Sequence, residues 1–240
     1  LHGLHPRIVE AIISFNPAGF TTTVVDGKSA EDQQVEAVKD ADFIMAFRAK
    51  LAERILRSAK RARLVQILSA GYDSINLKLL RELGIPCANN GGANSRAVAD
   101  HAVLAMLSLY RRLMAADQAV REGRWSAAID GMNTFEMANK VVGVLGFGNI
   151  GQKVARRIQA FDAIVQYCDI APLPPDRERE LKVKRVSLEE LFRTSDIVTC
   201  HTPLTRDTRH IVNRECLSMM KPTAVIINTS RGPVVDEVAL

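Results

Sequence analysis

The sequence lacks the features of membrane, secreted and repetitive proteins. Its longest uncharged apolar stretch lies around residues 141–148, far shorter than the roughly 20 residues that a membrane-spanning helix needs. No basic segment followed by an apolar one opens the chain, so no secretory leader is visible. Internal repeats and low-complexity stretches are also absent. We therefore expect a cytoplasmic protein with no membrane partner.

Metal and nucleic-acid binding lack sequence support as well. The chain has four cysteines, none of them in a C-x-x-C pair or beside a histidine cluster, so we predict no zinc or other metal. The net charge is +5, and the densest basic run, residues 54–63, is accompanied by apolar residues at helical spacing. That pattern is typical of a solvated helix face, and we predict no nucleic-acid partner.

What the sequence does contain is a regular alternation of short apolar strands and amphipathic helices. Its 240 residues allow one large domain or two modest ones. Strands alternating with helices predict parallel sheets built from strand–helix–strand units. A first series of strands is expected at 22–25, 43–47, 64–68 and 86–88, and a second at 141–145, 164–167, 197–200 and 224–228.

One long helical segment, residues 95–122, separates the two series of strands. Asn94 or Ser95 can cap its start, and Gly123 can end it. Two glycines at positions 91 and 92 stand just before this helix and suggest a hinge. We place the domain boundary there, with one α/β domain at residues 1–92 and a second at residues 93–240.

The strongest local motif is V-V-G-V-L-G-F-G-N-I-G at 141–151, a buried strand that runs into three glycines and a helix. Gly146 permits the tight turn, Gly148 lets the backbone approach a pyrophosphate, and Gly151 lets the helix pack close to the strand. The N-terminus of that helix offers free N–H groups to phosphates. Together these features predict a doubly wound, dinucleotide-binding Rossmann domain.

Asp169 ends the next strand, 18 positions after Gly151, close to the roughly 20 expected for a residue that binds the ribose hydroxyls of the cofactor. Its carboxylate would also repel a 2′-phosphate, and no arginine follows it immediately. We therefore predict NAD rather than NADP as the cofactor.

Two further segments, 196–208 and 224–236, follow later strands of the same predicted sheet. Ligands bind outside the carboxyl ends of parallel strands, so these segments should border the ligand. Arg231 is a permanent cation whose planar donor fork suits a carboxylate or a polarised carbonyl. The residues expected to line the crevice are Thr202, Pro203, Thr229, Ser230 and Arg231.

In their order along the chain, these motifs resemble the D-isomer-specific 2-hydroxyacid dehydrogenases, a family that includes D-3-phosphoglycerate, glyoxylate/hydroxypyruvate, D-lactate and formate dehydrogenases. The matching segments are 146–151, 187–205 and 219–240, with upstream matches at 69–77 and 94–101. The resemblance implies hydride transfer between NAD and C2 of a small 2-hydroxy or 2-keto acid. It also implies a flavodoxin-like substrate domain at 1–92 and an NAD-binding Rossmann domain at 93–240, both incomplete.

The same resemblance assigns roles to individual residues. Arg231 resembles the catalytic arginine that binds the substrate carboxylate and carbonyl, and the helix at 95–122 resembles the family's dimerisation element. Substrate contacts would come from Asn94 and from the main-chain N–H groups around Ala70, Gly71 and Tyr72. Cofactor contacts would come from Val98, Gly146, Gly148, Asn149, Ile150, Gly151, Asp169, Thr202, Pro203, Thr229, Ser230 and Arg231.

The sequence departs from the family pattern in one respect. The family's acid/base histidine stands in a P-H motif and its supporting glutamate in an E-P motif, and neither motif is present. We therefore expect the 240-residue chain to be inactive by itself, and we assign none of its five histidines as the acid/base. An alternative on the same fold is an NAD-responsive, corepressor-like binding protein. A third possibility, an S-adenosyl-ligand binder, is disfavoured by the segment around Arg231.

Overall fold

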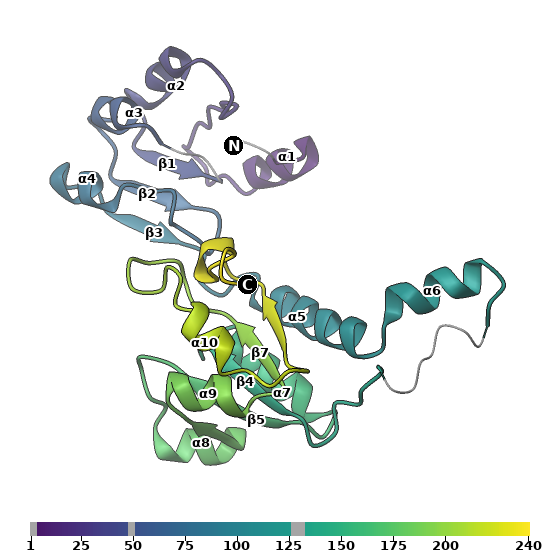
Figure 1. Ribbon diagram of the computed structural model, residues 1–240. Coiled ribbons are helices and arrows are strands. Elements are labelled where there is room, and N and C mark those ends of the chain that lie inside the picture. The colour runs from purple at the N-terminus through teal and green to yellow at the C-terminus, as the bar shows by residue number, and fades with distance from the viewer. Residues whose placement is uncertain (1–3, 48–50, 126–132) are drawn as a thin grey trace. The chain divides into compact units, whose positions relative to one another are not determined.

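The computed structural model describes residues 4–47, 51–125 and 133–240. The chain divides into two compact units, Leu1–Ala93 and Asn94–Leu240, and most of their helices and strands are labelled in Figure 1. The division falls one residue after the boundary expected from the sequence. The role of the first unit as a flavodoxin-like substrate domain, and the incompleteness of both units, stay predictions.

The first unit is built on a small parallel sheet with the strand order β1-β2-β3. The strands are β1 (Phe43–Ala46), β2 (Leu64–Ile67) and β3 (Cys87–Asn89), and the helices are α1 (Pro6–Ser14), α2 (Glu31–Val38), α3 (Glu53–Ser58) and α4 (Leu77–Glu82). Val65 and Ile67 of the central strand pack against Leu56 of α3 and Leu80 of α4. These buried contacts form the core of the unit.

The prediction of a strand at 22–25 is wrong, because these residues have no regular secondary structure. The expectation rested on a run of threonine and valine, which favour extended backbone. A strand also needs a neighbouring strand to complete its hydrogen bonds. Within the described residues, the sheet of this unit ends at β1, and no strand pairs with 22–25.

The second unit contains a five-stranded parallel sheet with the order β6-β5-β4-β7-β8. Its first strand therefore lies in the middle, and the chain winds outward in both directions, which confirms the predicted doubly wound fold. The strands are β4 (Val141–Leu145), β5 (Ile164–Cys168), β6 (Val183–Arg185), β7 (Ile197–Cys200) and β8 (Val225–Asn228). The connections contain α7 (Gly151–Gln159), α8 (Pro175–Leu181), α9 (Leu188–Thr194) and α10 (Arg214–Ser218), and the 3₁₀ turn η1 (Gly232–Val234) follows β8.

Both faces of this sheet are covered, which explains why its central strands show no alternation of apolar and polar residues. Val142 and Val144 of β4 belong to a core cluster that includes Val154 and Ile158 of α7. Val198 of β7 belongs to a second cluster, with residues of α9 and α10. The sheet is thus held rigidly between two apolar layers, with its carboxyl-terminal edge left for a ligand.

The helix expected at 95–122 is in fact two helices, α5 (Ser95–Tyr110) and α6 (Leu113–Arg121). Arg112 takes the left-handed conformation with φ of 48°, which ends the helical hydrogen-bond pattern although no glycine or proline marks the break. Asn94 does occupy the N-cap of α5, but its side chain makes no capping hydrogen bond. Gly123, with φ of 75°, follows the last turn of α6 as expected.

Candidate active site

The glycine turn after β4 has the geometry that its sequence predicts. Gly146 has φ of 90°, and a Cβ there would lie 2.8 Å from the Thr202 backbone nitrogen. A Cβ on Gly151 would collide with the Gly146 carbonyl oxygen and lie 3.0 Å from Val144 Cγ1. Only glycine therefore fits at these two positions. Around Gly148, in contrast, nothing lies within 4 Å of such a Cβ, so its backbone faces open space.

Asp169 joins the ends of β4 and β5. Its Oδ2 accepts a hydrogen bond from the Phe147 backbone N–H at 2.6 Å, and its Oδ1 accepts one from the Ala171 N–H at 2.9 Å. The carboxylate is thus fixed beside the glycine turn by two backbone donors. It keeps further lone pairs with which to accept hydrogen bonds from a ligand.

Behind Asp169, two aromatic rings support the turn. Phe147 stacks on Tyr167 with ring centroids 4.3 Å apart. The Tyr167 hydroxyl donates to Glu178 Oε1 at 2.6 Å and accepts from the Leu173 N–H at 3.0 Å. Burial, followed by the Glu178 hydrogen bond, raises the pKa of Tyr167, so the hydroxyl stays a donor at neutral pH. Tyr167 therefore positions the loop that follows Asp169.

At the end of β7, His201 lies between two threonines. Its Nε2 is 2.9 Å from Thr199 Oγ1, and its Nδ1 is 3.1 Å from Thr229 Oγ1. Burial lowers the pKa of His201 to about 4, so the ring is neutral at pH 7. A neutral imidazole has one donor and one acceptor nitrogen, so one threonine donates to the ring and the other accepts from it. His201 thereby ties the end of β8 to that of β7.

The turn after β8 is shaped by Asn228. Its Oδ1 accepts from both the backbone N–H and the hydroxyl of Ser230, at 3.0 and 2.7 Å, and its Nδ2 donates to the Arg231 carbonyl at 2.8 Å. Arg231 is exposed, and its Nη1 donates to the Ser230 carbonyl at 2.9 Å. Asn228 therefore fixes the backbone from which the guanidinium projects.

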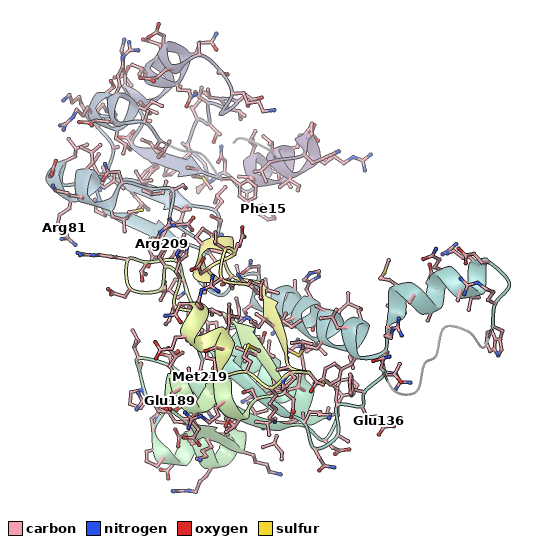
Figure 2. All side chains as sticks on the ribbon, viewed as in Figure 1. Phe15, Arg81, Glu136, Glu189, Arg209 and Met219 are labelled. Carbon is pink, nitrogen blue, oxygen red and sulfur yellow. The ribbon has the colours of Figure 1, made fainter. Side chains whose placement is uncertain are left out.

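The loop after β7 anchors the segment that follows Arg231. The His210 N–H donates to the Pro233 carbonyl at 2.8 Å, and the Val212 N–H donates to the Val234 carbonyl at 3.1 Å. Arg209 extends outward from the same loop (Figure 2) and is exposed. Arg231 is therefore held from both sides, by Asn228 before it and by these backbone bonds after it.

The residues present fit a dinucleotide. The open space at Gly148 is the cradle that a pyrophosphate needs, and the N-terminus of the nine-residue helix α7 faces it. Thr202 Oγ1, next to the turn, is buried with no hydrogen-bond partner in the described part of the chain. An orphaned hydroxyl in such a position suits a polar group of a ligand. Asn149 and Ile150 lie in the same turn, directly before α7.

The predicted site residues of the second unit gather at one edge of its sheet. Gly146 follows β4, Asp169 follows β5, Thr202 and Pro203 follow β7, and residues 229–231 follow β8. Asn94 and Val98 lie at the start of α5, where Asn94 is exposed and Val98 half-buried.

The predicted substrate loop lies in the first unit, after β2. The Ser69 hydroxyl donates to the Gly71 carbonyl at 2.8 Å, and the Asn89 amide donates to the Ala70 carbonyl at 2.6 Å. Both carbonyls are thus already satisfied. Within the described residues, the N–H groups of 70–72 donate no recorded hydrogen bond. The loop therefore presents donors, as an anion-binding loop would.

Sequence reasoning missed several residues that shape the site. Asn228 could have been found, since an asparagine two residues before a turn serine is typical of a turn held by a side-chain hydrogen bond. No sequence motif predicts the contact between Phe147 and Tyr167, because their stacking depends on β4 and β5 being neighbours in the sheet. Arg185 of β6 donates to the Asp169 carbonyl at 3.0 Å, although it lies 16 residues further along the chain.

A glycine turn, a following acidic strand end and a helix N-terminus at the switch point of a doubly wound sheet define a dinucleotide-binding Rossmann domain. Residues 103–240 match the family model described as D-isomer specific 2-hydroxyacid dehydrogenase, NAD binding domain. The chain therefore belongs to the D-isomer-specific 2-hydroxyacid dehydrogenase family. This confirms the family and the NAD cofactor expected from the sequence.

Two curated relatives and one solved structure illustrate the similarity. Hydroxypyruvate reductase of Thermotoga maritima is 36% identical over 88% of this chain and 67% of its own length. Glyoxylate reductase of Korarchaeum cryptofilum is 37% identical over 86% of this chain and 63% of its own. The chain thus spans about two thirds of these relatives. D-lactate dehydrogenase from Aquifex aeolicus, complexed with NAD and lactic acid, is 31% identical with a TM-score of 0.81, covering 98% of this chain and 68% of that one.

The helices and the metal-ligating side chains of the described residues bear on two other properties. None of their helices combines the length and the apolar character needed to cross a membrane. No group of three or more His, Cys, Asp or Glu side chains among them could hold a metal ion. The roles given to individual site residues stay predictions.

Proposed function

We propose that the protein is an NAD-dependent oxidoreductase that transfers a hydride to or from C2 of a small 2-hydroxy or 2-keto acid. The observation that best supports this is Arg231 at the same sheet edge as the glycine turn. β8 is two strands away from β4, about 10 Å at the usual spacing of neighbouring strands. A cation at that distance can hold an acid beside a dinucleotide whose pyrophosphate sits at the turn.

The residues of the second unit would divide the work between binding and charge stabilisation. When bound, NAD would supply the hydride donor or acceptor at its nicotinamide. Arg231 would hold the substrate carboxylate in a charge-assisted pair and stabilise negative charge on the C2 oxygen. His201 is unsuited to proton transfer, since its pKa is about 4 and both of its ring nitrogens are hydrogen-bonded. We assign the acid/base to none of the five histidines of this chain.

The substrate class draws support from two sources. The relatives named above are a hydroxypyruvate reductase and a glyoxylate reductase, which favours keto acids of two or three carbons. The donor-rich loop at 70–72 of the first unit suits a carboxylate as well. The corepressor alternative finds no support in these names. We also propose a cytoplasmic location, because the four cysteines are all free thiols, as is usual in a reducing compartment.

Arg231→Ala tests the assignment, with Arg193→Ala as the matched control. Arg193 is an exposed arginine in the last turn of α9, at the opposite edge of the sheet. We expect Arg231→Ala to bind NADH as the parent does but to lose at least tenfold in affinity for glyoxylate in the presence of NADH, measured by calorimetry. Arg193→Ala should change neither affinity. Unchanged glyoxylate binding by Arg231→Ala would refute the role of Arg231.

We also propose that the protein forms a homodimer through α5 and α6. Their outer surface carries apolar side chains that are between 48 and 76% exposed: Leu104, Leu109, Leu113, Met114 and Val120. In Figure 1, α6 lies apart from the sheet of its own unit, so this surface is accessible. Such a concentration of exposed apolar residues marks an interaction site more often than chance.

Light scattering coupled to size exclusion tests the dimer. The double substitution Leu109→Asp and Met114→Asp should convert a dimer to a monomer with unchanged NADH affinity. Val24→Asp, at a residue of the first unit that is 46% exposed, serves as the control and should leave the dimer intact. A parent protein that elutes as a monomer at all concentrations would contradict the proposal.

A further inference from the structure

Arg185 lies next to the predicted ribose-binding residue, although the two are far apart in sequence. It ends β6 and pairs in register with Tyr167 of β5, so its side chain reaches the end of the neighbouring strand. Its Nη2 donates to the Asp169 carbonyl at 3.0 Å. Arg185 is exposed, and no ion pair between it and a carboxylate is recorded among the described residues. An arginine has five N–H donors, so the guanidinium can still bind a ligand.

Two backbone donors converge on the same place. The N–H groups of Phe147 and Ala171 both point at the Asp169 carboxylate, at 2.6 and 2.9 Å. Two N–H groups and a nearby guanidinium make a site that attracts an anion. In this protein the anion in that site is the side chain of Asp169 itself.

We propose that Arg185, with the Phe147 and Ala171 N–H groups, forms a latent site for the 2′-phosphate of NADP(H), which the Asp169 carboxylate fills and blocks. This inference rests on the proposed NAD-binding role of the second unit. A 2′-phosphate beside an ionised Asp169 would place like charges together and leave both desolvated. Removing the carboxylate leaves the guanidinium and both backbone donors in place. One substitution at Asp169 therefore suffices to admit NADP(H), because Arg185 is already in place to bind the 2′-phosphate.

The test compares dissociation constants for NADH and NADPH, measured by calorimetry on the whole chain. Asp169→Ala should weaken NADH and tighten NADPH at least tenfold relative to the parent. Adding Arg185→Gln to Asp169→Ala should cancel that gain in NADPH affinity. Arg185→Gln alone should leave NADH affinity within threefold, because the Arg185 side chain donates to the Asp169 backbone carbonyl and not to the carboxylate proposed to bind the ribose.

Lys184→Gln in the Asp169→Ala background is the matched control. It removes the same charge from the adjacent position of β6, where side chains point to opposite faces, and Lys184 pairs with Glu190 at 2.9 Å. NADPH affinity should change less than threefold. Melting temperatures check that each variant is folded.

The outcomes separate the two proposals. NADPH that still binds tightly after loss of Arg185 would overturn the inference, as would folded Asp169 variants that bind NADH but gain no NADPH affinity. If Lys184→Gln lowered NADPH affinity as much as Arg185→Gln does, the effect would come from overall positive charge and not from Arg185, which would also overturn the inference. A parent chain that binds neither nucleotide would refute the proposed function, and the inference would fall with it.

Discussion

Gly148→Ala should abolish tight NAD binding while leaving the fold intact. A Cβ at Gly148 meets nothing within 4 Å, and the residue does not take a positive φ, so alanine fits the backbone without strain. The space that the Cβ would enter is the space in which a pyrophosphate has to approach the turn. This position thus separates function from stability, which few residues of a glycine turn can do.

The magnitudes follow from the contacts. Replacing a glycine by alanine in an allowed conformation stabilises a protein by about 0.4–1 kcal/mol, chiefly through the unfolded state. Displacing the pyrophosphate removes one or two charge-assisted hydrogen bonds, each worth about 1.5–3 kcal/mol. The total loss of about 1.5–6 kcal/mol corresponds to a fall in affinity of roughly 10- to 20,000-fold.

Gly143→Ala supplies the opposite control. A Cβ on Gly143 would collide with the Ser195 hydroxyl and lie 2.9 Å from Leu191 Cγ, so overpacking should cost about 1–3 kcal/mol of stability. Calorimetric titration with NADH and urea unfolding are then measured on both variants. We expect Gly148→Ala to lose affinity with no loss of stability, and Gly143→Ala to show the reverse. NADH affinity unchanged in a folded Gly148→Ala variant would refute the position of the pyrophosphate.

Two further predictions concern pH. Burial raises the pKa of Asp196, but other interactions lower it by more, so the net pKa is below the usual 3.8. The lowering comes from hydrogen bonds donated by Lys221 and the Val141 N–H, and from the positive charges of Lys221 and Lys140. Its stabilising contribution is therefore complete above the unfolded pKa and lost as pH falls through the folded value. Asp196→Asn should cost about 1–3 kcal/mol at pH 7. The unfolding free energies of parent and variant, measured in urea, should approach each other as the pH falls below 3.8, and a constant difference would contradict this. His201 has its pKa lowered from 6.5 to about 4, so the folded state should lose roughly 2 kcal/mol of stability between pH 7 and pH 5. His201→Gln should remove that part of the slope, and an unchanged slope in the variant would contradict the lowered pKa.

The parts of the fold that could be predicted from sequence are those with a local cause. The glycine turn was predicted together with the need for glycine at positions 146 and 151, because a buried strand and a helix flank it directly. The strands of the second series appear as expected because they are apolar on both faces. Gly123 ended the helix before it, since a positive φ favours glycine.

The parts that could not be predicted depend on distant residues or on weak local preferences. β6 has three residues, two of them charged, and it is a strand only because β5 offers an edge. The break at Arg112 lies in a run of helix-forming residues and needs a left-handed arginine. The run at 22–25 has the composition of a strand but no neighbouring strand. The contact of Arg185 with Asp169 exists only once the sheet has formed.

The proposed ligand-contacting atoms are positioned by side chains that would not touch the ligand. Asn228 fixes the turn of Arg231, His201 ties Thr229 to β7, and the stacked Phe147 and Tyr167 support the loop of Asp169. The His201 and aromatic contacts join neighbouring strands, and Asn228 holds its own turn, so these supports are fixed to the sheet. The site should therefore be preorganised before any ligand arrives, which reduces the cost of ordering on binding. It follows that specificity is decided by the few side chains at this edge that can still change partner, and Arg185 is the clearest of them.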